Sequence, residues 1–121
     1  MTKRKKSPDI ERELYKWHAD MCKVFSHPTR LEILNILRAQ EMPVTELARR
    51  LGVTIGNLSQ HLNMMKQRRV LTSRKEANNV YYRLANPKVL GAFDLIREIL
   101  MEQMGHESVV VRQLARAQAR S

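Results

Sequence analysis

The sequence predicts a mainly α-helical fold of about five helices that carries one small β-hairpin. Two observations predict this fold class: apolar residues recur every three or four positions through most of the chain, and two short runs rich in β-branched and aromatic residues follow residue 69. At 121 residues the chain has the length of one domain with a modest core. We divide it into a basic flexible arm at residues 1–8, a folded domain at 9–104 and a basic C-terminal tail at 105–121.

The charge balance predicts a polyanionic partner. The chain has 22 Lys and Arg against 12 Asp and Glu, a formal net charge of +10. Between residues 49 and 83 there are eight basic residues and a single acid, Glu76. This concentration of positive charge favours binding to a nucleic-acid phosphate backbone over a role in solubility alone.

Several other classes of protein are disfavoured. No apolar run approaches the roughly 20 residues of a membrane span, and the basic beginning is not followed by the apolar segment of a secretory signal. The single cysteine, Cys22, forms no disulfide within the chain and suits a reducing cytoplasm, where we expect the protein. The four histidines and one cysteine suggest no nucleophile–base pair, and there is no glycine-rich phosphate loop, so we expect no enzyme.

The first predicted helix follows residue 9 and has one apolar stripe. Its apolar residues are spaced at intervals of 4, 3, 4 and 3, the pattern of a helix that packs along another helix or its own symmetry mate: Ile10, Leu14, Trp17, Met21 and Val24. Pro28 marks its end and the start of the next helix, which runs to Gln40. That second helix is apolar on more than one side and should form the centre of the core.

Two short helices with a tight turn between them follow. We expect Thr45 to cap a helix from Glu46 to Leu51, and Gly52 to let that helix stop abruptly. Thr54 then caps a helix that reaches Gln67, with an apolar stripe of Leu58, Leu62 and Met65. Two helices around a short glycine-containing turn form a helix-turn-helix, whose second helix enters the DNA major groove.

The outward face of the second of these helices is made of small amide and hydroxyl side chains. Such groups donate and accept hydrogen bonds without repelling phosphates, as base readout requires. We expect Asn57, Ser59 and Gln60 to contact base edges, Gly56 to let the backbone approach DNA, and His61 to orient a loop or reach a phosphate rather than bind metal. The predicted DNA-binding residues are Thr54, Ile55, Gly56, Asn57, Ser59, Gln60, His61, Arg74 and Lys75.

The hairpin is predicted to join strands at residues 70–74 and 80–84. Asn78 and Asn79 suit its tight turn, and Arg74 and Lys75 bring positive charge close to its tip, where a wing contacts phosphates or the minor groove. Asn86-Pro87 begins a last long helix, suited to pairing with the first helix or a partner subunit. The tail has arginines at i+4 spacing, and the sequence leaves open whether it forms a helix: Arg112, Arg116 and Arg120.

Three segments together resemble the ArsR/SmtB family of small winged helix-turn-helix transcriptional regulators: FSHPTRLEILNIL, VTELARRLGVTIGNLSQHLNMMKQRRVL and SRKEANNVYYRL. The resemblance implies a homodimer joined by its first and last helices, which represses a promoter until a signal releases it. It also implies that Thr54 to Gln67 is the recognition helix and that the hairpin from Arg74 to Val80 is the wing.

The ligands of the family's usual metal sites are missing. The thiolate motif ELCVCDL of family sensors corresponds to EMPVTEL here, with Pro43 and Thr45 in place of the cysteines, and the last-helix ligand positions hold Asn86, Lys88, Ile99 and Glu102. We therefore expect no metal at these sites. His18 and Cys22, at i and i+4 on the first helix, are a less favoured candidate for a metal site shared by two subunits. The preferred interpretation is a surface histidine beside a partly buried structural thiol.

The combined prediction is a homodimeric regulator that binds double-stranded DNA, most simply a repressor released by a signal other than the usual metals. Two alternatives remain open. One is a sequence-tolerant DNA-compacting protein, which the basic termini suit. The other is an adaptor that binds a protein partner and whose winged helix is vestigial.

Overall fold

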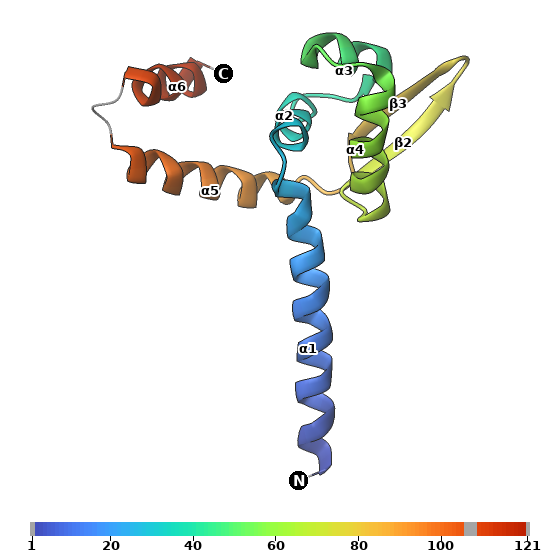
Figure 1. The fold of residues 1–121 in the computed structure, drawn as a ribbon, viewed down its shortest axis with the longest axis vertical. Helices are drawn as coiled ribbons and strands as arrows, with labels where there is room; N and C mark the ends of the chain where they lie inside the picture. Colours follow the sequence, from blue (N-terminus) through green and yellow to red (C-terminus); the bar gives the residue numbers. More distant parts are fainter. Residues whose placement is uncertain (1, 106–108, 121) are drawn as a thin grey trace. The chain divides into compact units, whose positions relative to one another are not determined.

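The structure, a computed structural model, describes residues 2–105 and 109–120 and confirms a mainly helical fold with a β-wing. It divides into two compact units, residues 1–87 and residues 88–121. The elements in chain order are α1 (Thr2–Cys22), the 3-10 helix η1 (Lys23–Phe25), α2 (Pro28–Ile36), β1 (Met42–Pro43), α3 (Val44–Leu51), α4 (Ile55–Gln67), β2 (Leu71–Glu76), β3 (Asn79–Leu84), α5 (Val89–Met104) and α6 (Val109–Arg120). Figure 1 labels the six α-helices and the strands β2 and β3.

The core of the first unit lies where η1, α2, α3, α4 and the start of β2 meet. The largest fully buried side chains are Val24, Ile33, Leu34, Leu47, Leu58, Leu62, Met65 and Leu71. Full burial of one such side chain stabilises the fold by about 1.5–3 kcal/mol. The predicted apolar stripe of α4 is confirmed, because all three of its residues have no exposed surface. The core therefore fixes which face of α4 points outward.

The helix-turn-helix follows the prediction except at the start of α3. Gly52 ends α3, as expected, and has the left-handed conformation with φ 69°. The expectation that Thr45 caps this helix is wrong: α3 begins at Val44, two residues earlier than predicted, and Pro43 is the N-cap, without a side-chain hydrogen bond. The ring of Pro43 fixes its own φ and places the chain for the first helical turn, so no hydroxyl cap is needed.

The wing belongs to a three-stranded antiparallel sheet in the order β1-β3-β2. Glu76 pairs with Asn79, so the hairpin loop has only two residues, and the positive φ of 56° falls on Ala77. Asn78 lies in this loop, as expected, but does not have a positive φ, and Asn79, expected in the turn, is already in the ladder. Met42 pairs with Tyr82 in a short third strand that the sequence did not indicate.

The two ends of the chain differ from the expected boundaries. The helix α1 begins at Thr2, so residues 2–8, expected to be an arm, lie within it; the Lys and Arg of this run are good helix formers. The tail residues 109–120 form the helix α6, and α5 groups with α6 rather than with the rest of the expected 9–104 domain. Among the described residues, no helix is both long enough and apolar enough to cross a membrane.

Candidate nucleic-acid interface

The helix α4 presents its N-terminal residues on an open surface. The hydroxyl of Thr54 accepts a hydrogen bond from the Asn57 main-chain N–H at 3.1 Å, which confirms the predicted N-cap. Gly56, Asn57 and Gln60 are exposed, and Ile55 keeps 46% of its surface. Beyond the adjacent residues and the backbone of α4 itself, no atom of the described residues lies within 4 Å of where a Gly56 side chain would begin. Glycine is therefore not required at this position by packing within the chain.

Ser59 differs from its neighbours on this face. It is half-buried, and its hydroxyl donates to the main-chain oxygen of Ile55 at 2.8 Å, one turn earlier in the same helix. Its proton is thus used within the helix, while the hydroxyl oxygen still has acceptor capacity. Asn57 and Gln60 are the two predicted base-reading residues with exposed amide groups.

His61 is half-buried between α4 and the start of α2. Its Nδ1 lies 3.2 Å from Nη1 of Arg30, and its ring centroid lies 4.4 Å from that of His27, the N-cap residue of α2. Burial lowers the pKa of His61, and the positive potential of His27 and Arg30 lowers it further. The ring accepts the Arg30 hydrogen bond and lies against the N-cap residue of α2.

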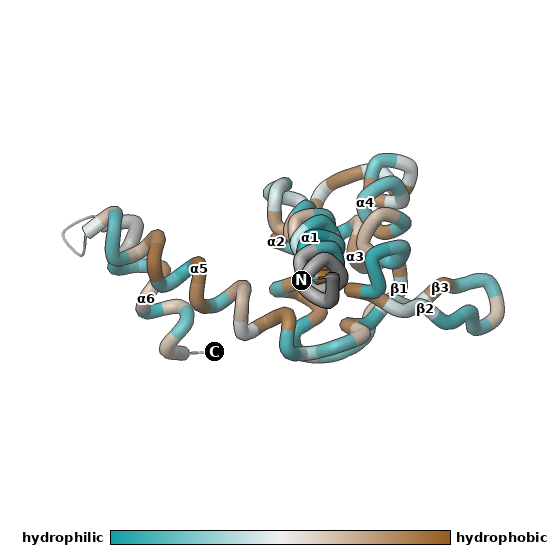
Figure 2. Tube along the Cα trace, turned by 90° about the horizontal axis from the view of Figure 1, so that it is seen from below, coloured by the Kyte–Doolittle hydropathy of each residue, from teal (hydrophilic) through white to brown (hydrophobic). Residues whose placement is uncertain are grey.

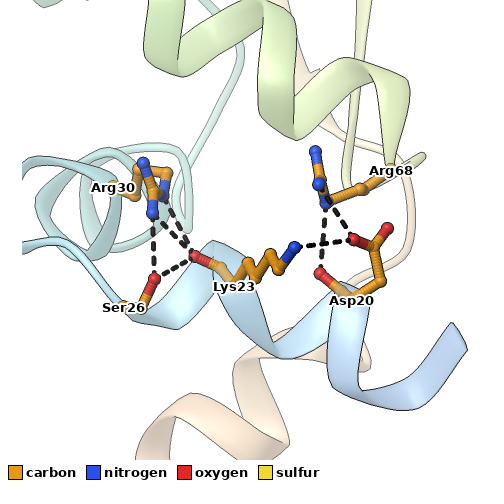
Figure 3. A network of polar contacts seen from close by, with 5 residues as sticks. All are labelled: Asp20, Lys23, Ser26, Arg30 and Arg68. Atoms are coloured by element: carbon orange, nitrogen blue, oxygen red, sulfur yellow. Dashed lines mark hydrogen bonds and ion pairs between the residues drawn. The ribbon is translucent and has the colours of Figure 1, made fainter. Parts of the chain in front are cut away.

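Arg30, near the start of α2, contacts the neighbouring η1 segment and also the distant helix α4. Figure 3 shows its contacts with Lys23 and Ser26. Its Nη2 donates to the Lys23 main-chain oxygen at 2.8 Å and to the Ser26 hydroxyl at 3.0 Å, and its Nε donates to the same Lys23 oxygen at 3.2 Å. With its contact to His61, it holds η1, α2 and α4 together. The contact between Arg30 and His61 is not apparent from the sequence, because the two residues are 31 positions apart.

Arg68 makes a second connection between α4 and α1, visible in Figure 3. Its Nη2 donates to Oδ1 of Asp20 at 2.9 Å, and its Nε donates to the Asp20 main-chain oxygen at 3.1 Å. The Arg68 hydrogen bond lowers the pKa of the Asp20 carboxyl, with a further contribution from Lys23. Asp20 lies among the apolar residues Trp17, Met21 and Val24 at helical spacing. An isolated acid at such a position is a sequence signal for an ion pair, which the spacing of apolar residues alone does not reveal.

Arg74 and Lys75, the two predicted DNA contacts of the wing, differ in whether other residues of the chain already bind them. Arg74 donates to Glu41 at 2.5 Å and to Glu76 at 2.5 Å, and its guanidinium lies 4.5 Å from the centre of the Tyr81 ring. Both carboxylates raise the pKa of Arg74. Lys75 is exposed and has no ion pair within the described part of the chain. Lys75 is therefore the more available of the two predicted wing contacts.

Known proteins resemble this chain in sequence and in fold. A family described as a helix-turn-helix domain matches residues 25–74. The transcriptional repressor PagR of Bacillus anthracis is 34% identical over 82 residues, which cover 67% of this chain and 82% of PagR. The chain belongs to the ArsR/SmtB family of winged helix-turn-helix transcriptional regulators.

Two further ArsR/SmtB comparisons bear on function. The transcriptional activator HlyU of Vibrio cholerae is 33% identical over 79 residues, covering 65% of this chain and 73% of HlyU. The solution structure of the homodimeric winged helix-turn-helix domain of Mb0332 from Mycobacterium bovis matches with a TM-score of 0.72 at 26% identity, covering 81% of this chain and 91% of that domain. This chain is accordingly a DNA-binding transcriptional regulator, in a family of regulators rather than enzymes.

The residues at the usual ArsR/SmtB metal positions do not fit a metal. Pro43 is the N-cap of α3 and Thr45 offers only a hydroxyl, so neither supplies a soft ligand. His18 and Cys22 are both exposed on α1. Across residues 2–105 and 109–120, no three His, Cys, Asp or Glu side chains gather as metal ligands. A site shared by His18 and Cys22 of two subunits remains a hypothesis, which metal analysis of the protein and of Cys22→Ser addresses.

Proposed function

We propose that this ArsR/SmtB protein is a homodimeric, sequence-specific repressor in which α4 reads base edges in the DNA major groove. The observation that carries the proposal is the outward face of α4. Gly56, Asn57 and Gln60 are exposed there, and the core holds the opposite face of the helix in place. Exposed amides on a fixed helix have the donors and acceptors that base pairs present in the major groove.

Exposed basic residues near this face supply the attraction to phosphates. Lys66 and Arg69 lie at the C-terminal end of α4, and Lys75 and Arg83 lie on the wing. Contacts of this type set affinity and register without reading sequence. Arg74 contributes positive charge to the wing while it also neutralises Glu41 and Glu76, which would otherwise repel the phosphates.

Exposed apolar side chains on α1 and α5 support the homodimer. On α1, Ile10 and Leu14 keep 67% and 56% of their surface exposed; on α5, Ile99 and Leu100 keep 51% and 50%. Figure 2 shows hydrophobic positions, in brown, recurring along α5. A two-fold interface built from such faces buries the same patch on both subunits and sets two recognition helices about 34–36 Å apart, one turn of DNA.

Repression is the direction we assign. A dimer bound across a promoter excludes polymerase without any further contact, and PagR is named a repressor. HlyU is named an activator, so the same fold is compatible with both directions. A reporter gene behind the selected operator distinguishes them: repression lowers expression when the protein is present, and activation raises it.

Selection from a random duplex pool tests the proposal. The full chain is used to recover preferred sequences, whose affinity is then measured against random DNA at physiological salt. A specific regulator binds its site at least about 10³-fold more tightly than random DNA. A ratio close to one identifies a sequence-tolerant compacting protein, and the absence of duplex binding identifies an adaptor; either result rejects the proposal.

A further inference from the structure

The helix α6 carries positive charge and no negative charge. Residues 109–120 contain Arg112, Arg116 and Arg120 at intervals of four and no acidic residue. Like charges at this spacing destabilise an isolated helix, and a helix of 12 residues is marginal in water even without them. Arg116 is exposed and makes no ion pair within the described part of the chain. A negatively charged partner would therefore stabilise α6.

The helix α5, in the same compact unit, carries a matching row of acids. Asp94, Glu98 and Glu102 also recur at intervals of four, so they lie along one side of the helix. Glu98 and Glu102 are exposed and make no ion pair with any residue in 2–105 or 109–120. The one arginine of α5, Arg97, has its guanidinium carbon 4.6 Å from the centroid of the Phe93 ring. Two carboxylates of the row are therefore available to a cation.

The connection between the two helices brings the two rows into register. Only residues 105–108 join α5 to α6, a length that is typical of two antiparallel helices. In Figures 1 and 2, α6 runs back along α5. Glu102 lies two residues before the end of α5, and Arg112 lies three residues after the start of α6, so both are at about the same height. Glu98 and Arg116 come next, each four residues further from the connection.

The acidic row is separate from the apolar side of α5 that the homodimer uses. Successive residues of an α-helix are about 100° apart, so Glu98 lies about 160° from Ile96 and from Leu100. With α6 in place, Ile96 and Leu100 keep 47% and 50% of their surface exposed, so α6 does not cover them. A second copy of the chain can therefore bury the apolar side of α5 while α6 lies on the acidic side.

We propose that α6 docks on the acidic side of α5 in the same chain, with Arg112 paired to Glu102 and Arg116 paired to Glu98. The planar fork of a guanidinium matches a carboxylate with two parallel hydrogen bonds. One exposed ion pair contributes little to stability, but two pairs in register also remove the repulsion between the arginines of α6. The short connection favours this partner, because it keeps the two rows close together at any protein concentration.

The pairing has a consequence for DNA binding. Unpaired arginines bind the phosphates of any duplex, which strengthens binding to random DNA and lowers the ratio of operator affinity to random affinity. The carboxylates of α5 neutralise the arginines of α6 and so preserve that ratio. This consequence rests on the proposed function, because it concerns a regulator that must distinguish its operator from other DNA. The pairing of α6 with α5 does not depend on that function.

Hydrogen exchange of the main-chain amides of α6, measured on the full chain without DNA, tests the pairing. Glu98→Arg places a like charge opposite Arg116 and should speed exchange in α6 by about fivefold, because a favourable pair is replaced by a repulsive one. The double variant Glu98→Arg with Arg116→Glu restores an opposite-charge pair in the same register. Exchange in α6 of this double variant should return to the parental rate.

The double variant Glu98→Arg with Arg112→Glu is the matched control. It has the same composition and net charge as the restoring variant, but it places like charges opposite both Glu102 and Arg116. Exchange in α6 should therefore be faster than in Glu98→Arg alone. Exchange in α4 should be the same in all variants, which shows that the winged helix is folded. At equal net charge, the control should also bind random DNA at least about threefold more tightly than the restoring variant.

The proposal is overturned if the two double variants exchange alike in α6. It is also overturned if exchange in the parental α6 slows as the protein concentration rises, because a second copy then holds the helix, or if it slows only when duplex DNA is added, because nucleic acid is then the partner. If exchange follows the prediction but the two double variants bind random DNA alike, the effect on DNA binding is rejected and the pairing stands. None of these results alters operator selection by α4, so the two proposals fail independently.

Discussion

Arg68 joins the end of the recognition helix to α1 through Asp20, with one hydrogen bond to the carboxylate at 2.9 Å and one to the main-chain oxygen at 3.1 Å. At the middle of the same helix, His61 contacts Arg30, which in turn holds the Lys23 main-chain oxygen. The position of α4 therefore depends on the C-terminal end of α1 and on η1 as well as on its own apolar stripe.

Asp20→Asn should weaken operator binding by roughly two- to fivefold, the effect of losing one solvent-accessible ion pair. The sign of this change in affinity separates a positioning role of Asp20 from a simple effect of its charge. Removing an acid from a DNA-binding protein otherwise strengthens binding, because it lowers the repulsion of phosphates. Fluorescence anisotropy with the selected operator measures the effect, and Glu13→Gln, which removes an exposed acid of α1, is the control expected to bind equally or more tightly. Tighter binding by Asp20→Asn would rule out a positioning role for this pair.

Lys75→Gln should weaken binding to every duplex and reduce the slope of log affinity against log salt by about 1, as the loss of one phosphate contact does. Arg74→Gln should weaken binding at least as much, because Glu41 and Glu76 lose the cation that neutralises them. Titrations at several salt concentrations with operator and random DNA measure both effects. An unchanged slope in Lys75→Gln would place the tip of the wing outside the interface.

The helix-turn-helix was readable from the sequence because its determinants are local. Thr54, Gly52 and the spacing of Leu58, Leu62 and Met65 act within one or two helical turns, and all behave as predicted. The connections through Arg30 and Arg68 were not readable, because each joins residues at least 31 positions apart and follows no period.

Sequence patterns were also insufficient where neighbouring residues compete for one role. Thr45 is a good cap by type, but Pro43 already places the first turn of α3. Asn78 and Asn79 are good turn residues by type, but the register of the ladder puts the strained position on Ala77. A basic residue that forms an ion pair cannot be told from one that does not by sequence alone. The structure shows that Arg74 pairs with two carboxylates, whereas Lys75 is exposed and has no ion pair among the described residues.

Stability should fall in mild acid through His61. Burial lowers the pKa of His61 in the folded chain, so below its unfolded value of about 6.5 the unfolded chain takes up a proton that the folded chain resists. The stabilisation is therefore complete above that value and is lost as the pH falls toward the lower folded value. The free energy of unfolding is measured with urea from about pH 7.5 to about pH 5.5. It should fall more steeply with pH in the parent than in His61→Gln, by up to about 1.4 kcal/mol per pH unit. If the free energy of unfolding falls equally with pH in the two proteins, His61 has the same pKa in the folded and the unfolded chain, and this prediction is wrong.

Ile99→Glu should disrupt the dimer, raising its dissociation constant by more than about 10²-fold, because a carboxylate is costly in an apolar interface. Operator affinity should fall with it, since one recognition helix then binds alone. Gln103→Glu changes the charge equally on an exposed polar position of α5 and should leave both properties nearly unchanged. Analytical ultracentrifugation supplies the measurement. A stable dimer in Ile99→Glu would exclude this face of α5 from the interface.

The central claim is that the outward face of α4 reads sequence, and Gln60→Ala tests it most directly. Duplexes selected from a random pool by the parent and by Gln60→Ala are compared position by position. We predict that the variant loses its preference at one or two base pairs, by about 1–3 kcal/mol, and keeps the rest of the operator profile. An unchanged profile for Gln60→Ala, with unchanged affinity for every duplex, would contradict the assignment of α4 as the element that reads DNA.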